Sequence, residues 1–232
     1  MSQVTLIPSA QVLEWDTEFW GFNVARTDTV EVEGWARRNR IGVAFLLIDA
    51  DNIARVHEAE RRDWRLMDVR VTLEREPAEM MPEKTLIFPH AGYLGPLGDI
   101  ARSAHRITRF YADPRFPDDR CDDLYEGWLR NHCAGGISRV LVAERERQPA
   151  GYCSVGVANG EAHIGLIAVR EDLRGQGIGR DLVASAVNYA NAEGARTMSV
   201  VTQGRNVPAL RLFERCGFRI AKTELWFHRW FV

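Results

Sequence analysis

A glycine-rich hexapeptide in the second half of the chain is the stretch best suited to chemistry. It follows an apolar segment of strand length, Ala162 to Arg170, and it opens a segment with helical periodicity, Gly177 to Glu193. A loop between a strand and a helix presents backbone N–H groups at the positive end of the helix, where a phosphate or pyrophosphate binds. Glycine suits such a loop because it tolerates positive φ and lets an anion approach the backbone. The loop consists of Arg174, Gly175, Gln176, Gly177, Ile178 and Gly179.

Two common phosphate-binding motifs do not match this loop. A P-loop ends in Gly-Lys-Ser or Gly-Lys-Thr, and this loop lacks that ending. The dinucleotide-binding fingerprint reads G-x-G-x-x-G and belongs to an early βαβ unit, whereas this loop reads G-x-G-x-G and lies late in the chain.

The elements that must position the loop are predicted from periodicity, turn residues and helix caps. Asn159-Gly160 indicates a type I′ turn immediately before the strand that leads into the loop. We predict a charged turn containing Pro149 in the preceding hairpin, and a helix start at Asp118 or Asp119. In chain order, the second half is predicted to begin with two helices, over Leu97–Tyr111 and from Asp118 or Asp119 to His132. Three strands follow, over Ser138–Glu144, Ala150–Val157 and Ala162–Arg170. After the loop and its helix we predict a strand over Arg196–Thr202, a helix that begins at Asn206, and a strand pair over Phe218–Ala221 and Glu224–Phe231.

The spacing of Arg174, Gly177 and Gly179 resembles the R-x-x-G-x-G pyrophosphate loop of the GCN5-related N-acetyltransferase (GNAT) superfamily. The resemblance extends to Leu166–Val169 and to Asn206–Phe218, and the predicted order of elements is also that of the superfamily. It implies an α/β (α+β) protein with the GNAT fold, built on a central mixed, mostly antiparallel sheet. It also implies acetyl-CoA as the co-substrate, with no metal.

The resemblance further implies how the donor is held. In the superfamily, the strand before the loop splays away from its neighbour, and its backbone pairs with the pantetheine arm and the acetyl carbonyl. Here that role falls on Ile167, Ala168 and Val169, while the loop N–H groups bind the pyrophosphate. Asn206 would anchor the pantetheine arm, although it also suits a plain helix cap. Phe213 stands where the superfamily usually has a tyrosine acid, so no acid is assigned.

The first half is predicted to form a smaller α/β unit. Strands are expected near Val24–Val30, Gly42–Asp49 and Asp63–Arg75, with a helix over Ala50–Arg62 between the last two. Prolines and glycines then interrupt the pattern from Glu76 to Asp99. We therefore expect an N-terminal domain with a proline-rich linker over residues 1–96 and the acetyltransferase domain over residues 97–232.

Composition favours an ordinary globular protein. The chain has 232 residues, is 46% hydrophobic and 27% charged, and carries a net charge of −2, which argues against nucleic acid as a partner. No apolar run reaches the roughly 20 residues of a membrane span, and Met1–Ala10 does not resemble a signal peptide. The four cysteines show no metal-ligand spacing. These features predict a cytoplasmic protein with reduced thiols and no membrane partner.

Two residues are candidates for the base that deprotonates an amine acceptor. Asp68 lies on an alternating strand, where a carboxylate is more commonly solvated or paired, and Arg70 is available on the same face. The other candidate is His163, because the ordinary pKa of a histidine side chain, about 6.5, suits the task. Strict alternation would place it on the same side as Gly165, Ile167 and Val169, although a lone strand histidine is more often structural.

The chain also resembles the bacterial nucleotide-sugar branch of the superfamily, typified by dTDP-fucosamine acetyltransferases, in which an acidic residue occupies the strand position of Asp68. This resemblance implies transfer of an acetyl group to the amine of a dTDP-linked amino-dideoxy sugar, and a possible homodimer. Two alternatives stay open. One is a GNAT enzyme acting on another small amine or peptide, and the other is a non-catalytic acyl-CoA-binding module. The sequence leaves open which aminosugar and which amine position are used, and whether the acyl group is longer than acetyl.

Overall fold

The computed structural model describes residues 10–81, 85–90, 95–135 and 138–231. Contacts divide the chain into two compact units, one formed by Met1–Arg70 with Thr223–Val232 and the other by Val71–Lys222. Strands β4 (Arg65–Arg75) and β10 (Arg219–Trp230) each contribute residues to both units. The division into domains at residues 96 and 97 stays a prediction. The expectation that the first ten residues are not a signal peptide concerns residues 1–9, which lie outside the described part of the chain.

In the sheet of the first unit, the central strand β3 (Ile41–Asp49) lies between a strand from near the start of the chain and the last strand of the chain. Strand β3 pairs in parallel with β2 (Asn23–Thr27) and antiparallel with β10, from Glu224 opposite Asp49 to Trp230 opposite Val43. Strand β1 (Ala10–Val12) pairs antiparallel with β2. The helices of this unit are α1 (Glu14–Trp20), α2 (Glu33–Arg38) and α3 (Ile53–Arg61).

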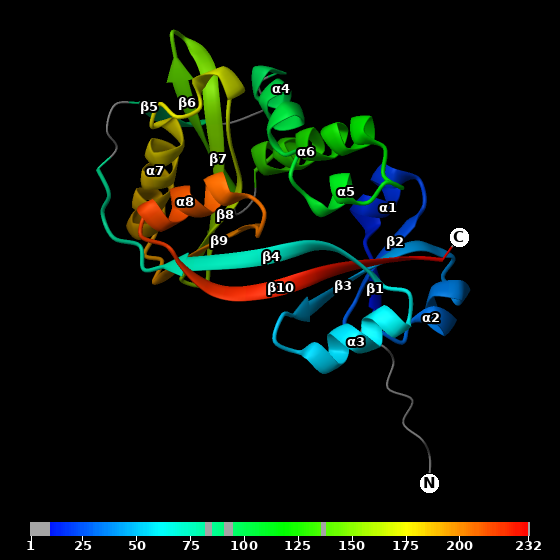
Figure 1. Ribbon diagram of the computed structural model, residues 1–232. Coiled ribbons are helices and arrows are strands. Elements are labelled where there is room, and N and C mark those ends of the chain that lie inside the picture. Colours follow the sequence, from blue (N-terminus) through cyan, green and yellow to red (C-terminus); the bar gives the residue numbers. More distant parts are fainter. Residues whose placement is uncertain (1–9, 82–84, 91–94, 136–137, 232) are drawn as a thin grey trace. The chain divides into compact units, whose positions relative to one another are not determined.

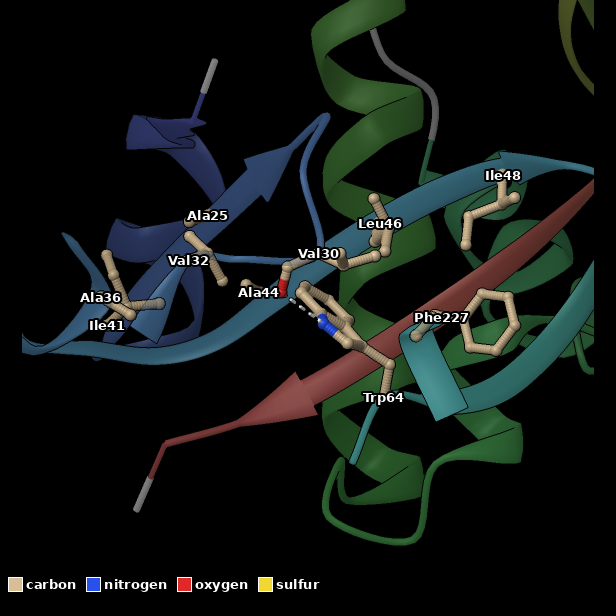
Figure 2. Packing of buried hydrophobic residues seen from close by; sticks show 11 residues of the cluster. Ala25, Val30, Val32, Ala36, Ile41, Ala44, Leu46, Ile48, Trp64 and Phe227 are labelled. Carbon is tan, nitrogen blue, oxygen red and sulfur yellow. Dashed lines mark hydrogen bonds between the residues drawn. The ribbon is translucent and has the colours of Figure 1, made fainter. Parts of the chain in front are cut away.

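The core of the first unit is organised around Trp64. Figure 2 shows its indole among aliphatic side chains, with the ring N–H aimed at the Val30 carbonyl. The Nε1–O distance is 3.1 Å, so the polar atom of this buried ring is satisfied. Phe227 on β10 belongs to the same cluster, which ties the end of the chain to residues near its beginning.

The second unit contains a mixed, mostly antiparallel sheet, as the sequence predicted. Its strands lie in the order β9-β8-β7-β6-β5, and only β9 runs parallel to its neighbour. Asn159 and Gly160 have φ of 54° and 79°, which is the geometry of the predicted type I′ turn. The bounds are β5 (Leu86–His90), β6 (Ser138–Arg145), β7 (Gln148–Ala158), β8 (Glu161–Val169) and β9 (Thr197–Gln203).

Helices cover both faces of this sheet. Figure 1 shows α7 (Ile178–Ala192) on one face and α4 (Gly95–Ala104) with α6 (Asp118–Cys133) on the other. Below, these are called the α7 face and the α6 face. The remaining elements of the unit are α5 (Arg109–Ala112), the 3-10 turn η1 (Glu171–Leu173) and α8 (Val207–Arg215).

The single helix predicted over Leu97–Tyr111 is wrong. Helix α4 ends at Ala104, and α5 begins at Arg109 after Thr108, whose φ of −143° is extended. Tertiary contacts explain the break, because the Thr108 carbonyl accepts a hydrogen bond from Arg205 Nη2 at 3.0 Å.

The predicted hairpin over residues 218–231 is also wrong, because β10 is continuous from Arg219 to Trp230. Its middle, Lys222-Thr223, offers no turn-forming residue, and the Thr223 carbonyl accepts from Ala50 N at 3.0 Å.

Two smaller predictions also need correction. Pro149 belongs to β7, opposite Glu144, and the turn consists of Glu146 and Arg147, whose φ values are 51° and 61°. The cap residue of α6 is Pro117, so Asp118 and Asp119 lie in the first helical turn, near the positive end of the helix dipole.

Candidate functional site

Strand β8 has one open backbone edge directly before the glycine loop. Its pairing with β9 begins at Glu161 opposite Thr197 and ends at Ile164 opposite Val200. On its other edge, β8 stays paired with β7 as far as Val169. The two parallel strands therefore part after Ile164, and among the described residues the backbone from there to Val169 pairs with a strand on one side only.

The hydrogen-bond alternation of β8 identifies the groups that point into this opening. Arg170 N donates to Ala150 O at 2.9 Å, so this pair is a hydrogen-bonded pair of the antiparallel ladder. Bonded and non-bonded pairs alternate, so Ala168 bonds toward β7, whereas the N–H and C=O groups of Ile167 and Val169 point away from it. The Val169 carbonyl accepts from Arg174 Nε at 3.2 Å, which links the strand end to the loop.

The glycine loop presents free space in front of the first turn of α7. Gly175 and Gly177 have φ of 77° and 87°, and a Cβ added at either position would meet nothing within 4 Å. Gly177 is the cap residue of α7 and provides no side-chain acceptor, while the first helical bond runs from Asp181 N to Gly177 O at 3.1 Å. At this helix start the cap residue therefore has no side chain to compete with an anion for the N–H groups of Ile178 and Gly179.

The other loop residues differ in what they contact. Ile178 is buried and anchors the start of α7, while Arg174 and Gln176 are exposed. At Gly179, an added Cβ would lie 3.3 Å from Leu212 Cδ2 and 3.7 Å from Val169 Cγ2. This glycine therefore lets α7 pack closely on α8 and on the end of β8.

Helix α8 carries the two remaining donor-site candidates. The Asn206 side-chain oxygen accepts from Ala209 N at 3.4 Å, so this residue caps the helix. Phe213 is 1% exposed and packs edge-on against Phe218, with ring centroids 5.8 Å apart. The position that is tyrosine in the superfamily is therefore a buried aromatic contact without a hydroxyl.

A β-bulge changes the side-chain alternation of β8. Cys153 pairs with Ile167 and Val155 pairs with Ile164, so Ser154 alone faces Gly165 and Leu166. Ser154 Oγ accepts from Leu166 N at 2.8 Å and so takes up this backbone donor of the bulge.

Because of this bulge, the prediction that His163 shares a face with Ile167 and Val169 is wrong. His163 pairs with Gly156, which lies on the same face of β7 as Ser154 and Tyr152. That is the α6 face, whereas Ile167 and Val169 point to the α7 face. The extra residue at the bulge shifts the side-chain alternation of β8 by one, so odd-numbered residues before and after it face opposite sides of the sheet.

Two histidines lie on the α6 face beside the opening of β8. A Cβ added at Gly156 would lie 2.6 Å from Cε1 of His163, so the exposed His163 ring lies over that glycine. A Cβ added at Gly165 would lie 2.8 Å from Cε1 of His132, which comes from α6. Burial lowers the pKa of His132, and positive charge on His163 lowers it further. Sequence reasoning missed His132, although the glycine inside a strand at position 165 signals a close approach by another group.

A third histidine, also missed, lies near the loop. His105 Nε2 is 2.9 Å from Tyr152 Oη, and the ring stacks on Tyr125 with centroids 4.7 Å apart. Burial and the nearby Arg174 guanidinium lower its pKa to about 4. His105 is therefore neutral at pH 7 and serves as a hydrogen-bond partner for a buried tyrosine.

Asp68, the other candidate base, belongs to the first unit. It is 7% exposed, and its Oδ1 accepts from Val69 N at 2.9 Å. Arg70, considered above as a partner for Asp68, forms an ion pair with Glu224 of the same unit. Asp68 therefore belongs to the first unit and His163 to the second.

The described residues contain no group of three or more His, Cys, Asp or Glu side chains that could hold a metal ion. Within the same residues, no helix is both long enough and apolar enough to cross a membrane. All four cysteines have free thiols.

Comparison with known proteins gives a family match. The model of the acetyltransferase (GNAT) family matches residues 101–218. The dTDP-fucosamine acetyltransferase of Escherichia coli O6:H1 is 25% identical over 95% of this chain and 98% of its own length. The spore coat polysaccharide biosynthesis protein SpsD of Bacillus subtilis is 28% identical over 61% of this chain, which spans about half (49%) of that relative. A GCN5-related N-acetyltransferase from Kribbella flavida has a similar fold, with a TM-score of 0.63 at 15% identity over 97% of this chain and 88% of that one.

Proposed function

This chain belongs to the GNAT acetyltransferase family, and we propose that it moves an acetyl group from acetyl-CoA to the amine of a dTDP-linked amino-dideoxy sugar. The observation that carries this proposal is the open edge of β8 beside an uncapped helix start. The outward-pointing Ile167 and Val169 backbone groups would pair with the pantetheine arm, and the N–H groups after Gly177 would bind the pyrophosphate. Asn206 would add an amide contact to the same arm.

The reacting carbonyl would lie against Ile167. Its N–H points into the opening, whereas Leu166 N is already bonded to Ser154 Oγ, so Ile167 would donate to the oxygen that becomes negative during attack. The amine would approach from a face of the sheet, because attack on a carbonyl carbon occurs out of the carbonyl plane. His163 on the α6 face, or Asp68, would serve as the base that removes the ammonium proton.

The leaving group would depart without a tyrosine acid. Phe213 has no proton to donate, but a thiol pKa of about 8.5 makes the thiolate a tolerable leaving group. The missing hydroxyl is thus compatible with turnover.

The acceptor class is supported by two relatives whose names refer to sugars or polysaccharide synthesis. One of them, dTDP-fucosamine acetyltransferase, aligns over nearly the full length of both chains. We propose the same acceptor class here, together with a cytoplasmic location and a possible homodimer.

The test is release of CoA thiol from acetyl-CoA against a panel of amines. The panel contains dTDP-4-amino-4,6-dideoxyhexoses, free aminosugars and peptides, and calorimetry measures acetyl-CoA binding in parallel. Release only with the dTDP-linked sugars is the expected result. Release with a peptide or a free aminosugar instead would reject the acceptor while keeping the enzyme.

A second candidate is a non-catalytic acyl-CoA-binding module, which Phe213 favours because the usual acid is missing. This reading predicts tight acetyl-CoA binding with no thiol release for any amine in the panel. The same pair of measurements therefore separates the two functions.

A further inference from the structure

Two imidazoles from different elements converge on the bulge of β8. His132 extends from α6 over Gly165, and His163 on β8 extends over Gly156 of the neighbouring strand. The third polar group is the Ser154 hydroxyl, whose oxygen would lie 2.8 Å from a Cβ added at Gly165. Glycine at 165 and 156 thus leaves room for two histidine rings on one face of the β7–β8 ladder.

Gly165 fills this role through its size rather than through its backbone conformation. Its φ is not positive, so another residue type could adopt this backbone conformation without the strain of the left-handed region. An added Cβ would instead lie too close to His132 Cε1 and Ser154 Oγ. Since glycine in a strand interior weakens the strand, its presence here marks a close approach by another group.

This histidine cluster lies beside the backbone expected to hold the acyl group. Gly165 begins the part of β8 that has left β9, and Ile167, with its outward N–H, follows two positions later. His132 is half-buried at the bulge, whereas His163 is exposed. His132 therefore lies nearer the open edge of β8, and His163 lies nearer the solvent.

We infer that His132 is a further proton acceptor of acetyl transfer and works with His163 as a pair. This inference rests on the function proposed above. The pair would take protons from the acceptor nitrogen on the α6 face, His132 receiving them first and His163 passing them to water.

The proton balance of the reaction gives two histidines a purpose. The ammonium loses one proton before its nitrogen attacks the acetyl carbon. The tetrahedral intermediate loses a second proton from the same nitrogen as the C–S bond breaks and CoA leaves as thiolate. Because Phe213 offers no proton to the thiolate, neither proton is returned within the site. Both must leave through neutral bases, one after the other.

The electrostatics of the pair support this sequence. The titratable group facing His132 from β8 is His163, and β7 contributes the uncharged Ser154 hydroxyl. Burial and the His163 charge lower the pKa of His132, so His132 is neutral and able to accept a proton at pH 7. The exposed position of His163 lets the pair release a proton to solvent between the two steps.

The first test measures the electrostatic coupling between His132 and His163 and needs no substrate. Histidine titrations are followed by NMR in the wild type and in His163→Gln. We expect the midpoint of His132 to move upward, toward 6.5, when the neighbouring charge is removed. An unchanged His132 midpoint would overturn the pair even if the enzyme is active.

The second test measures kcat against pH with the best amine of the panel for His132→Gln, His163→Gln and the double variant. A base contributes about 10²–10⁴-fold, so we expect each single variant to lose about tenfold in kcat and the double variant more than about a hundredfold. His132→Ala should regain activity when free imidazole is added, which a purely structural role would not produce. His57→Ala, an exposed histidine of the first unit, is the matched control.

The outcomes separate the two proposals. Activity of His132→Gln equal to that of His57→Ala across the pH range, or absence of imidazole rescue, would overturn the role of His132. Lack of thiol release by the wild type with every amine would overturn the proposed enzyme, and with it this role, whatever the NMR titration shows.

Discussion

At the scale of single residues, the glycines of this chain serve two distinct physical purposes. Gly175 and Gly177 are needed for their backbone conformation, since φ is positive and the space around them is open. Gly165 and Gly156 are needed for space, since their φ values are ordinary and an added Cβ would meet a histidine ring. The first kind shapes the proposed anion site, and the second kind leaves room for the two histidine rings.

Replacing Gly177 with alanine should weaken donor binding. Holding a non-glycine residue in the left-handed region costs about 1–2 kcal/mol, so the loop would relax away from the geometry that aims its N–H groups. We expect acetyl-CoA affinity, measured by calorimetry, to fall about tenfold. Gly95→Ala in α4, which also has open space but no positive φ, is the control. Equal affinities for the two variants would contradict the role of the loop conformation.

Restoring a tyrosine at position 213 should have a small kinetic effect. If thiolate departure does not need an acid, Phe213→Tyr will raise kcat by less than about tenfold. The measurement is steady-state thiol release at saturating acetyl-CoA. A rise of a hundredfold or more would show instead that protonation of the leaving group limits the natural enzyme.

At the scale of elements, the proposed function gives one residue at the start of α8 a role in binding beside its role in stability. Asn206 caps the helix with its side-chain oxygen, which leaves the amide nitrogen for a ligand. The sequence could not separate these two roles, because the cap and the proposed pantetheine contact require the same residue at the same position. Variants that change only one of the two atoms can separate them.

Asn206→Asp and Asn206→Ala should therefore differ. Aspartate keeps the capping oxygen, so its Tm should match the wild type, while loss of the amide donor raises KM for acetyl-CoA. Alanine loses both and should lower the free energy of unfolding by about 1 kcal/mol. Thermal unfolding and steady-state kinetics measured on both variants decide the matter. A normal KM for the aspartate variant would reduce Asn206 to a cap.

His105, which directly follows α4 and contacts Tyr152 of β7, makes the stability of the second unit sensitive to acid. Its pKa is lowered to about 4 in the folded protein, so the unfolded chain binds the proton first as pH falls below 6.5. Stability should therefore be lost between pH 6.5 and pH 4, by up to about 3 kcal/mol. Denaturant unfolding across this range should show a shallower pH dependence for His105→Gln. Parallel slopes for variant and wild type would contradict this origin.

At the scale of the whole molecule, prediction from sequence succeeded where the signals are local. The glycine loop, the Asn159-Gly160 turn and the bounds of β8 depend on neighbouring residues, and they were predicted to within about a residue. Features decided by distant partners were missed. The continuous β10 depends on pairing with β3, and the bulge depends on Ser154 facing Gly165 and Leu166. His132 could not be placed beside Gly165 without the packing of α6 on the sheet.

The pairing of β3 with β10 makes a prediction about the N-terminal fragment. Residues 1–96 alone lack β10, so the β3 backbone from Val43 to Asp49 would lose its antiparallel partner. We expect this fragment to unfold without cooperativity in a denaturant titration followed by circular dichroism. Joining residues 219–232 to it through a flexible linker should restore a cooperative transition. Cooperative unfolding of the unmodified fragment would show that β10 is dispensable for this unit.

The bulge on β8 divides one strand into two segments whose side-chain alternation is out of step. The segment after it presents the outward backbone groups of Ile167 and Val169, and these groups do not depend on which side chains the segment carries. In the segment before it, the His163 side chain lies on the face opposite to the side chains of Ile167 and Val169. Deletion of residue 165 would remove the bulge and turn His163 toward α7. A single added residue thus decides which face of the sheet the side chains before it present, while the backbone edge after it is unaffected.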